Sequence, residues 1–322
     1  MMPDEPAMTN PSISVVIPTY NQPDLLRETL DSVFAQTFGD YEVIVVNDGS
    51  TDTTAGRLEE MRATYGERLR VITTTNGGVG AARNRGIDEA RGKYVATLDH
   101  DDIWLPRKLE VQFGFMEAHP ECGSCVVPYA YNDRPGIPAY GVEDIAFPNG
   151  IVRRPWLVST ISAPVLMSSV LMFDRVRAVG LRYGTQRQCI EDVEFQLKLV
   201  ARGAVGIASF DVLAQYRLHE TNYSGQSIFY DRGIRRLRRL EREGAFDSLV
   251  GHDLDDARAY LASLGRTAAV RSLLAGKRAA GLLTFLRELP HQIRQRRLRF
   301  LAIFPVLLLA PASILRRYPR NP

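Results

Sequence analysis

Short apolar runs recur along the first hundred residues of the chain, each four to six residues long and rich in Val and Ile. Runs of this length and composition are typical of strands that are buried on both faces of a parallel sheet. We therefore predict four strands, at Ile13–Ile17, Tyr41–Val46, Leu69–Ile72 and Tyr94–Leu98.

The segments between these runs have the period of amphipathic helices. Pro23 suits the first position of a helix. The apolar residues that follow share one helical face: Leu26, Leu30, Val33 and Phe34. Similar patterns predict a helix that Asp52 caps and another that runs from the glycines at 77–80 to about Ala90. This alternation predicts an α/β fold, in which helices flank a mostly parallel sheet.

Beyond about residue 105 the alternation is less regular. Residues 128–165 are rich in Pro, Gly and aromatic residues, which predicts loops with short strands. Further strands are predicted at Val165–Asp174 and Val205–Tyr216, with a helix at Cys189–Ala201 between them. From residue 226 onward the pattern is helical and basic.

The basic residues gather in the C-terminal third. The formal net charge is only +3, which does not favour a nucleic-acid partner, but residues 232–242 and 294–299 are strongly basic. Residues 300–315 form an apolar stretch that is short for a membrane-spanning helix and is interrupted by Pro305 and Pro311. We expect this stretch to lie in a membrane interface or to pack as a hydrophobic tail, with an anionic membrane surface as a partner of the C-terminal region.

The three cysteines are an odd and low number, which argues against a disulfide framework and favours a reducing compartment. Cys122 and Cys125 form a CxxC motif. It is either a redox pair, half of a zinc site with His119, or a set of small residues that lead into a strand at Val126. The N-terminal residues are acidic and lack the apolar stretch of a signal peptide. We expect a cytoplasmic protein, peripheral to the inner face of the cell membrane.

Polar residues follow three of the predicted strands. Residues 18–21 follow the first strand, Asp48 follows the second, and the cluster Asp99–Asp102 follows the fourth. The carboxyl ends of parallel strands share one edge of the sheet, and ligands of such sheets bind there. We therefore expect a single site at this rim.

The carboxylates that follow the fourth strand repel one another and resist burial unless a cation neutralises them. Mg²⁺ and Mn²⁺ prefer carboxylate oxygens and share their coordination with phosphates, so Asp99 and Asp101 are predicted to hold such an ion. The alternative is a capping cluster for the helix that contains Leu105–Met116, a role that we assign to Asp102. Without metal, we expect this loop to be poorly ordered or its acids to be partly protonated.

The remaining rim residues suit a nucleotide. Asp48 can accept a hydrogen bond from a base or a ribose hydroxyl, and Thr19 and Tyr20 can frame a base plane. Arg83 and Asn84 lie in a helix that begins at a glycine-rich turn, whose backbone amides suit phosphate. This turn lacks the glycine spacing of dinucleotide-binding proteins and the lysine of a P-loop.

The sequence resembles the family 2 glycosyltransferases in two stretches, SVVIPTYNQPDLLRETLDSVFAQTFGDYEVIVVNDGSTDTT and NGGVGAARNRGIDEARGKYVATLDHDDIWLP. The resemblance covers about residues 12–110 and resumes at CIEDVEFQLKLVARG and YRLHETNYS. It implies an inverting, metal-dependent enzyme of the GT-A fold, Rossmann-like, which uses a nucleotide sugar with Mg²⁺ or Mn²⁺ as cofactor.

The resemblance also implies roles for residues that match the family's motifs. Asp99 and Asp101 match the metal-binding DxD pair, in which Asp99 also contacts the donor. Arg83 and Asn84 match an element near the base and the phosphate. The residues that match the nucleoside-binding segments are Pro18, Thr19, Tyr20, Asn21 and Asp48.

Two residues of the later segments match catalytic positions. Asp192 matches the general base, and Glu191 beside it is expected to raise the pKa of Asp192; the alternative is a helix cap. His219 matches a histidine that closes over the diphosphate or the metal; the alternative is an ordinary surface histidine. Arg217 can bind phosphate or pair with a neighbouring acid.

We expect residues 1–225 to form the nucleotide-sugar-binding catalytic domain and residues 226–322 a helical extension, which we take to be associated with the membrane. A QxxRW motif and a multi-span membrane region are absent, which favours transfer of a single sugar. The expected donor is UDP- or dTDP-linked, and the expected acceptor is a hydroxyl of a glycan or lipid-linked intermediate in cell-surface polysaccharide biosynthesis. The alternatives are a non-catalytic nucleotide-sugar-binding protein and a dinucleotide-dependent oxidoreductase.

Overall fold

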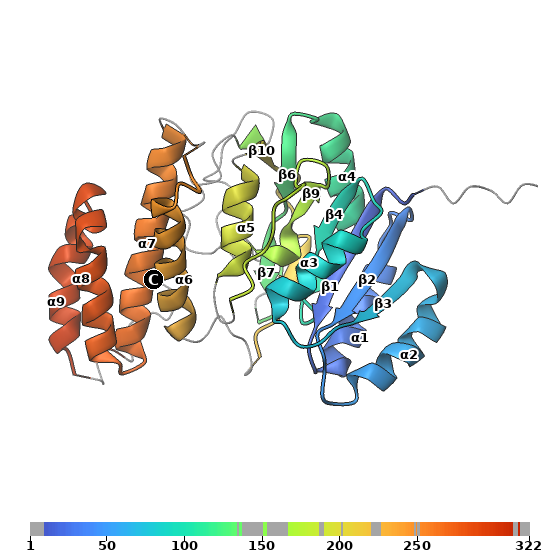
Figure 1. Cartoon of the computed structure of the whole chain (residues 1–322), viewed down its shortest axis with the longest axis horizontal. Helices are drawn as coiled ribbons and strands as arrows, with labels where there is room; N and C mark the ends of the chain where they lie inside the picture. The colour runs from blue at the N-terminus through green and yellow to red at the C-terminus, as the bar shows by residue number, and fades with distance from the viewer. Residues whose placement is uncertain are drawn as a thin grey trace, which may run out of the picture.

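The chain folds into a mixed α/β region followed by a group of helices, and the two lie side by side along the longest axis of the molecule (Figure 1). The structure, a computed structural model, describes residues 10–133, 135–136, 151–152, 167–186, 190–200, 202–219, 227–247, 249, 252–311 and 315. The predicted α/β fold with a helical C-terminal region is confirmed.

Eight strands form the central sheet, in the order β3-β2-β1-β4-β9-β6-β10-β8. Within the described residues, β9 and β8 run antiparallel to the other six strands. The four strands predicted in the first hundred residues are all present and parallel. The bounds are β1 Ile13–Thr19, β2 Tyr41–Asn47, β3 Leu69–Thr73, β4 Tyr94–Thr97, β6 Cys122–Val126, β8 Ile151–Val152, β9 Met172–Asp174 and β10 Ala204–Ile207.

Helices cover both faces of this sheet. On one face lie α1 (Pro23–Phe34), α2 (Thr54–Tyr65) and α4 (Lys108–Ala118), and on the other lie α3 (Val79–Glu89) and α5 (Glu191–Val200). The chain reverses its direction across the sheet between β3 and β4, so β1 and β4 flank the point where the strand order switches. A crevice at the carboxyl ends of such strands is where ligands bind in open α/β sheets.

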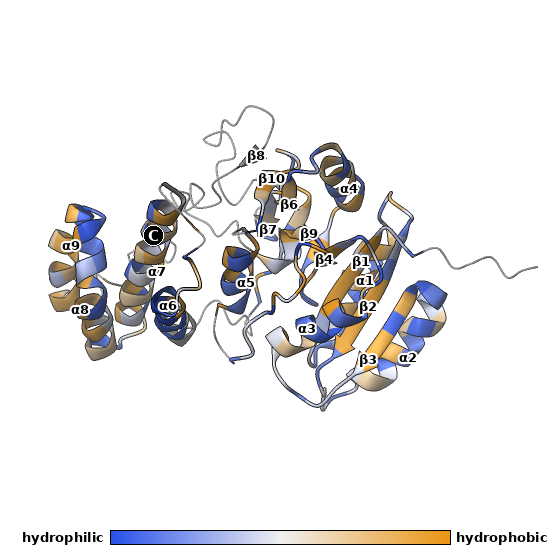
Figure 2. Cartoon of the chain, turned by 45° about the horizontal axis from the view of Figure 1, so that its top comes forward, coloured by the Kyte–Doolittle hydropathy of each residue, from blue (hydrophilic) through white to orange (hydrophobic). Residues whose placement is uncertain are grey.

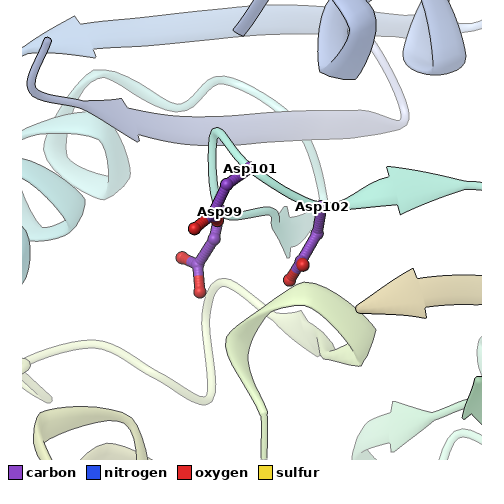
Figure 3. Close-up of side chains that lie close together, drawn as sticks. All are labelled: Asp99, Asp101 and Asp102. Atoms are coloured by element: carbon purple, nitrogen blue, oxygen red, sulfur yellow. The ribbon is translucent and has the colours of Figure 1, made fainter. Parts of the chain in front are cut away.

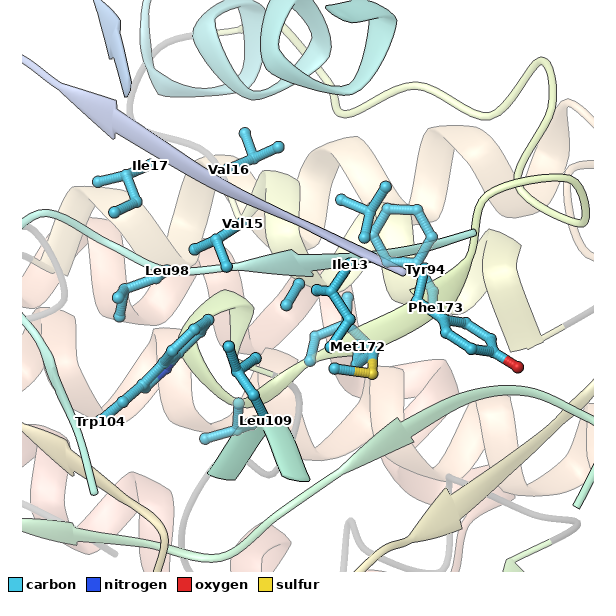
Figure 4. Packing of buried hydrophobic residues seen from close by; sticks show 14 of the residues in the cluster. Ile13, Val15, Val16, Ile17, Tyr94, Leu98, Trp104, Leu109, Met172 and Phe173 are labelled. Atoms are coloured by element: carbon cyan, nitrogen blue, oxygen red, sulfur yellow. The ribbon is translucent and has the colours of Figure 1, made fainter. Parts of the chain in front are cut away.

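One glycine of α3 sets the distance between this helix and the sheet. A Cβ atom on Gly86 would lie 2.3 Å from Cγ1 of Val16, so a larger residue would push α3 away from β1. Val15 points to the opposite side of β1, the side on which Leu109 of α4 lies, and the strands are largely hydrophobic (Figures 4 and 2). The close packing places Arg83 of α3 beside the carboxyl ends of β1 and β4.

A second, smaller sheet joins two distant segments. It consists of β5 (Ile103–Trp104), β11 (Ala214–Tyr216) and β7 (Tyr129–Tyr131), in the order β5-β11-β7. Ala214 pairs with Trp104 in antiparallel orientation. The residues that precede β5 and those that follow β11 therefore lie next to each other.

Two of the predicted strands are wrong in their extent. In the predicted stretch Val165–Asp174, of which residues 167–174 are described, Ser168–Val170 forms a 3-10 helix (η4) and Met172–Asp174 forms the strand. The stretch Val205–Tyr216 is two strands, β10 and β11, which lie in different sheets. Polar residues explain both errors. Ser168 and Ser169 interrupt the first stretch and residues 209–211 interrupt the second, and the chain bends at each, although the apolar residues alone predict one continuous strand.

The region after residue 226 is helical, as predicted, and its described residues form four helices. They are α6 (Ser227–Arg242), α7 (His252–Leu274), α8 (Arg278–Arg294) and α9 (Leu298–Leu309). Within the described residues, none of the helices combines the length and the apolar character that crossing a bilayer requires.

The helical extension packs directly against α5. Ile190, at the start of α5, contacts α6 so closely that a Cβ atom on Gly233 would lie 2.5 Å from Cγ1 of Ile190. The buried Glu194 of α5 accepts hydrogen bonds from Arg236 of α6 at 3.1 and 3.3 Å. The α5 residues in the shared hydrophobic cluster are Ile190, Val193 and Leu197.

Candidate active site

Residues 99–102 form a turn that connects β4 to β5. The Asp102 N–H donates a hydrogen bond to the Asp99 carbonyl at 3.1 Å and closes the turn. One carboxylate oxygen from each of Asp99, Asp101 and Asp102 lies within 4.8 Å of the others. The Asp99 and Asp101 side chains lie together, whereas Asp102 extends separately from them (Figure 3).

Asp102 is buried and does not cap the following helix. Its Oδ2 accepts a hydrogen bond from the Ser169 hydroxyl, and its Oδ1 accepts one from the Arg217 backbone N–H at 3.1 Å. The capping prediction is wrong because β5 separates this residue from α4 and turns its side chain inward. Burial, together with the charges of Asp101 and Asp99, raises the pKa of Asp102 well above its usual range, as expected for a partly protonated acid.

The other two carboxylates of the turn face groups that can carry positive charge. Arg83 Nη2 donates to the Asp99 carboxylate, and Arg83 Nη1 donates to Glu191 Oε1 at 2.8 Å. The Nε2 atom of His219 lies 2.8 Å from Asp101 Oδ2. The structure therefore brings together five of the residues that the sequence singled out.

These residues fit a divalent cation. Both oxygens of Asp102 accept hydrogen bonds from the protein, whereas the bonds to Arg83 and His219 use one oxygen each of Asp99 and Asp101, so these two carboxylates are the better placed to hold an ion. Carboxylate oxygens with one imidazole nitrogen in reach suit Mn²⁺, and the carboxylates alone suit Mg²⁺. His219 beside Asp101 is the nitrogen in reach.

Arg217 anchors the turn from the side of α1. Its Nε donates to the Asp101 carbonyl, and its Nη1 pairs with Glu28. Its Nη2 donates to the Leu25 carbonyl and to Thr29 Oγ1, both at 2.9 Å. Of the two roles left open by the sequence, the structure places Arg217 in the ion pair. The contributions of Glu28 and Thr29 were not predicted, since neither stands in a recognisable motif.

Asp192 lies in the first turn of α5. Burial, and next the charge of Glu191, raise the pKa of Asp192 to about 7, although Arg83 opposes the shift. Burial also raises the pKa of Glu191, in spite of its contact with Arg83. The helix begins at Glu191 rather than at Cys189, which lies outside the described residues. A carboxylate with a pKa near 7 can exchange a proton close to neutral pH.

Arg83 connects these two acidic groups. It is buried, and its guanidinium lies 5.1 Å from the centre of the Tyr183 ring. Burial disfavours its charge, but Asp99 and Glu191 outweigh this effect and raise the pKa of Arg83. The amide of Asn84 bonds to the main chain of Tyr183 at both ends, at 3.0 and 2.8 Å. In this structure Asn84 therefore fixes the segment that covers Arg83.

Asp48 lies at the end of β2 and is buried. Its two carboxylate oxygens accept hydrogen bonds from the N–H groups of Gly77 and Gly78, each at 2.8 Å. Its own N–H donates to the Thr19 carbonyl at 2.9 Å. Asp48 thus fixes the glycine-rich turn against the carboxyl ends of β1 and β2.

The segment after β1 completes this side of the rim. Pro18 and Thr19 are buried in β1, whereas the Tyr20 ring is 41% exposed and accessible to a ligand. Asn21 has a φ of 60°, and its Oδ1 accepts a hydrogen bond from the Thr51 N–H at 3.0 Å. The predicted nucleoside-binding residues therefore share one edge of the sheet.

Cys122 and Cys125 are part of β6 and are buried. Burial raises the pKa of the Cys122 thiol to about 11 and that of Cys125 to about 12. Redox and zinc chemistry both require a thiolate, which this environment disfavours.

Sequence comparisons identify similar proteins. A model described as Glycosyl transferase family 2 matches residues 14–174. A putative teichuronic acid biosynthesis glycosyltransferase, TuaG of Bacillus subtilis (strain 168), is 30% identical over 249 residues, which cover 74% of this chain and 95% of TuaG. An uncharacterized glycosyltransferase of Rickettsia bellii (strain RML369-C) is 44% identical over 106 residues, 33% of this chain. The chain spans only 15–32% of the length of this and two further Rickettsia glycosyltransferases.

Solved structures share the fold. S. aureus TarS 1–349 in complex with UDP-GlcNAc has a TM-score of 0.59 and 20% identity, and the match covers 88% of this chain and 92% of that one. The mannosyltransferase PcManGT from Pyrobaculum calidifontis, in complex with GDP-Man and Mn²⁺, has a TM-score of 0.57 and 19% identity, with 94% and 88% covered. At these identities the likeness concerns the fold alone, and it confirms the predicted GT-A fold.

Proposed function

The chain belongs to glycosyl transferase family 2, and we propose that it is an inverting enzyme that transfers a single sugar from a nucleotide-diphosphate sugar to an acceptor hydroxyl. One observation carries this proposal. Arg83 bridges Asp99 of the acidic turn and Glu191 of α5, so the oxygens that suit a metal lie close to Asp192, whose pKa is near 7.

Each residue then has a defined task. Asp192 takes the proton from the acceptor hydroxyl on the face opposite to the leaving group, which inversion requires. Asp99, Asp101 and His219 hold Mg²⁺ or Mn²⁺, which supplies Lewis-acid stabilisation of the leaving diphosphate when it is bound. Arg83 contributes fixed positive charge next to the same group.

The proposed donor is UDP- or dTDP-linked. Its nucleoside lies at the carboxyl ends of β1 and β2, where Tyr20 is exposed and where the Asp48 oxygens keep lone pairs that can accept a hydrogen bond from a ribose hydroxyl or a base N–H. TarS, which was solved with UDP-GlcNAc, supports a uridine nucleotide. The remaining residues assigned to the donor are Pro18, Thr19, Asn21, Arg83, Asn84, Asp99 and His219.

The proposed acceptor is a glycan or lipid-linked intermediate of cell-surface polysaccharide, met at the inner face of the cell membrane. TuaG supports the pathway class, because its name assigns it to teichuronic acid biosynthesis. We further propose that residues 1–225 are the catalytic domain and residues 226–322 an extension. The interleaved packing of α5 and α6 means that this boundary divides the chain but not the hydrophobic cluster.

The test combines donor binding with transfer. A thermal-shift screen of nucleotide sugars with Mn²⁺ should identify a stabilising donor, and Asp192→Asn should keep this binding while it abolishes transfer. Asp24→Asn, at a side chain that is 89% exposed, serves as the matched control. Unchanged transfer in Asp192→Asn would exclude the base assignment. Donor binding without transfer in the wild-type protein would instead indicate a non-catalytic nucleotide-sugar-binding protein.

A further inference from the structure

A cavity of about 270 Å³ lies in the helical extension, between α6, α7 and α8. None of the residues assigned above to the donor, the metal or the base is among those that line it. Its lining residues are Glu241, Arg242, Arg258, His291, Arg294 and Gln295.

The cavity has a positive charge balance. Among its described lining residues, the carboxylate is that of Glu241. It accepts hydrogen bonds from Arg238 Nη1 at 2.9 Å and from Arg258 Nε at 3.3 Å. Arg242 donates its Nε to the Arg238 carbonyl at 3.2 Å. Over the described part of the chain, neither Arg242 nor Arg294 pairs with a carboxylate. A guanidinium group without a carboxylate partner suits a phosphate group, which it binds through two parallel hydrogen bonds.

Exposed apolar side chains continue from the cavity along the outer face of α8. Leu283 is 66% exposed, Leu286 52% and Ile293 58%. Ile293 directly precedes Arg294 of the cavity lining, and it lies seven residues after Leu286, on the same side of the helix. The surface therefore carries positive charge and apolar area side by side.

The helix that follows α8, α9, extends this apolar surface. On α9, Leu298, Val306 and Leu309 are exposed, while Phe304 on the opposite side is buried against Phe285 of α8. Both helices lie at the end of the molecule away from the central sheet (Figure 1), and both carry hydrophobic stretches next to hydrophilic ones (Figure 2). The turn between them adds further positive charge from Arg296 and Arg297, and the first turn of α9 adds Arg299.

We propose that the cavity binds the phosphate of an anionic membrane lipid, and that the exposed side chains of α8 and α9 enter the boundary between headgroups and acyl chains. A basic surface next to an exposed apolar one is the pattern by which helices attach to the plane of an anionic bilayer. This inference rests on the proposed membrane-face location of the acceptor.

Co-sedimentation of the full chain with lipid vesicles tests the charge contribution. We expect binding to vesicles that contain phosphatidylglycerol and little binding to vesicles of phosphatidylcholine alone. Arg242→Gln with Arg294→Gln should weaken binding about fivefold for each guanidinium lost, the factor that one cationic side chain contributes at an anionic surface. Arg91→Gln with Arg107→Gln removes the same charge from exposed positions of the α/β region and should leave binding unchanged.

A second pair of variants tests the apolar contribution. Leu283→Ser with Leu286→Ser should weaken vesicle binding without loss of folding, because both side chains are already exposed. Val176→Ser with Val179→Ser is the matched control, since these residues are 71% and 67% exposed on the α/β region. Equal binding by the test and control pairs would overturn the proposal.

Two further results would overturn the lipid assignment. One is stabilisation by inorganic phosphate that depends on Arg242 and Arg294, in the absence of vesicle binding, because the cavity would then take free phosphate. The other is self-association that Leu283→Ser abolishes, again without vesicle binding, because the face would then be an interface between two copies. Vesicle binding needs neither donor nor acceptor, so its failure is distinguishable from a failure of glycosyl transfer.

Discussion

Two acidic regions meet at the rim of the sheet, and they differ in how their charge is compensated. In the turn between β4 and β5, Asp99 contacts Arg83, Asp101 contacts His219, and Asp102 accepts hydrogen bonds from a hydroxyl and an N–H group. At the start of α5, the side chain of Arg83 reaches Glu191. The Asp192 carboxylate accepts a hydrogen bond from the N–H of Val193, at 2.8 Å.

The difference shows how the single guanidinium of Arg83 can give two acidic groups different properties. Arg83 compensates Asp99 and Glu191, and this leaves Asp192 with a neighbouring negative charge and a pKa of about 7. In the proposed function the turn holds a cation, whereas Asp192 takes up and releases a proton. The same residue type serves both purposes because its partners differ.

The largest expected effect follows from removing a charge of the turn. Asp101→Asn should lower transfer by about 10²- to 10³-fold, because the amide supplies no negative charge to the cation next to His219. The donor-induced thermal shift should also lose its dependence on Mn²⁺. Asp211→Asn, an exposed residue of the β10–β11 loop, is the control. Mn²⁺-dependent binding that persists in Asp101→Asn would contradict the ligand assignment.

Removing the shared guanidinium should affect both regions at once. Arg83→Gln leaves Asp99 and the buried Glu191 without their partner, which should lower the free energy of unfolding by about 3 kcal/mol, measured by urea denaturation. Because Arg83 lowers the pKa of Asp192, its loss should also move the pH midpoint of transfer upward. Arg85→Gln, at an exposed position of α3, should change neither quantity. An unmoved midpoint would show that Arg83 does not act on Asp192.

The pH dependence of transfer and of stability tests the acidic group at the start of α5, which contains Asp192. Transfer by the wild-type protein should rise as pH increases through about 7, since a base must be ionised. The pKa of Asp192 is raised in the folded state, so its contribution to stability falls as pH rises from about 4 to about 7. Asp192→Asn should therefore raise the free energy of unfolding at pH 8 by about 1–3 kcal/mol and leave it unchanged near pH 3. Equal effects at both pH values would contradict the raised pKa.

The smallest expected effect concerns Asp102, the carboxylate of the turn that is buried. Ser169→Ala removes one of the two hydrogen bonds to Asp102 and should destabilise the fold by about 1 kcal/mol, with transfer reduced far less than in Asp101→Asn. Ser209→Ala, in the β10–β11 loop, is the control. The Ser169 hydroxyl also accepts a hydrogen bond from the Asp99 N–H at 3.1 Å, so a loss of transfer as large as that of Asp101→Asn would mean that Ser169 is required to position the acidic turn.

The sequence was sufficient for the parts of the fold that depend on local pattern. The parallel strands and their helices follow from short apolar runs and helical periodicity, and the rim follows from where polar residues stand relative to those runs. The pairing of Glu191 with Asp192 also predicted the direction of the pKa shift, because both the burial and the neighbouring charge act upward.

The supporting contacts of the site could not be predicted in this way. Thr29, Ser169 and Tyr183 belong to three segments that only the folded chain brings to the rim, and none of them carries a local signal. Asp102 was misassigned because β5 has two residues, too few to leave a periodic pattern. Its inward direction follows from the pairing of β5 with β11, a contact between segments about one hundred residues apart.

The position of α5 between two hydrophobic clusters has a consequence for how such enzymes diversify. Phe195 and Leu199 pack in the core of the sheet, whereas Ile190, Val193 and Leu197 pack with α6 and α7. Recombination at residue 226 would join the second set to foreign helices, in direct contact with the turn that carries Asp192. An exchange of the extension that preserves this packing has to include α5, and with it the proposed base Asp192.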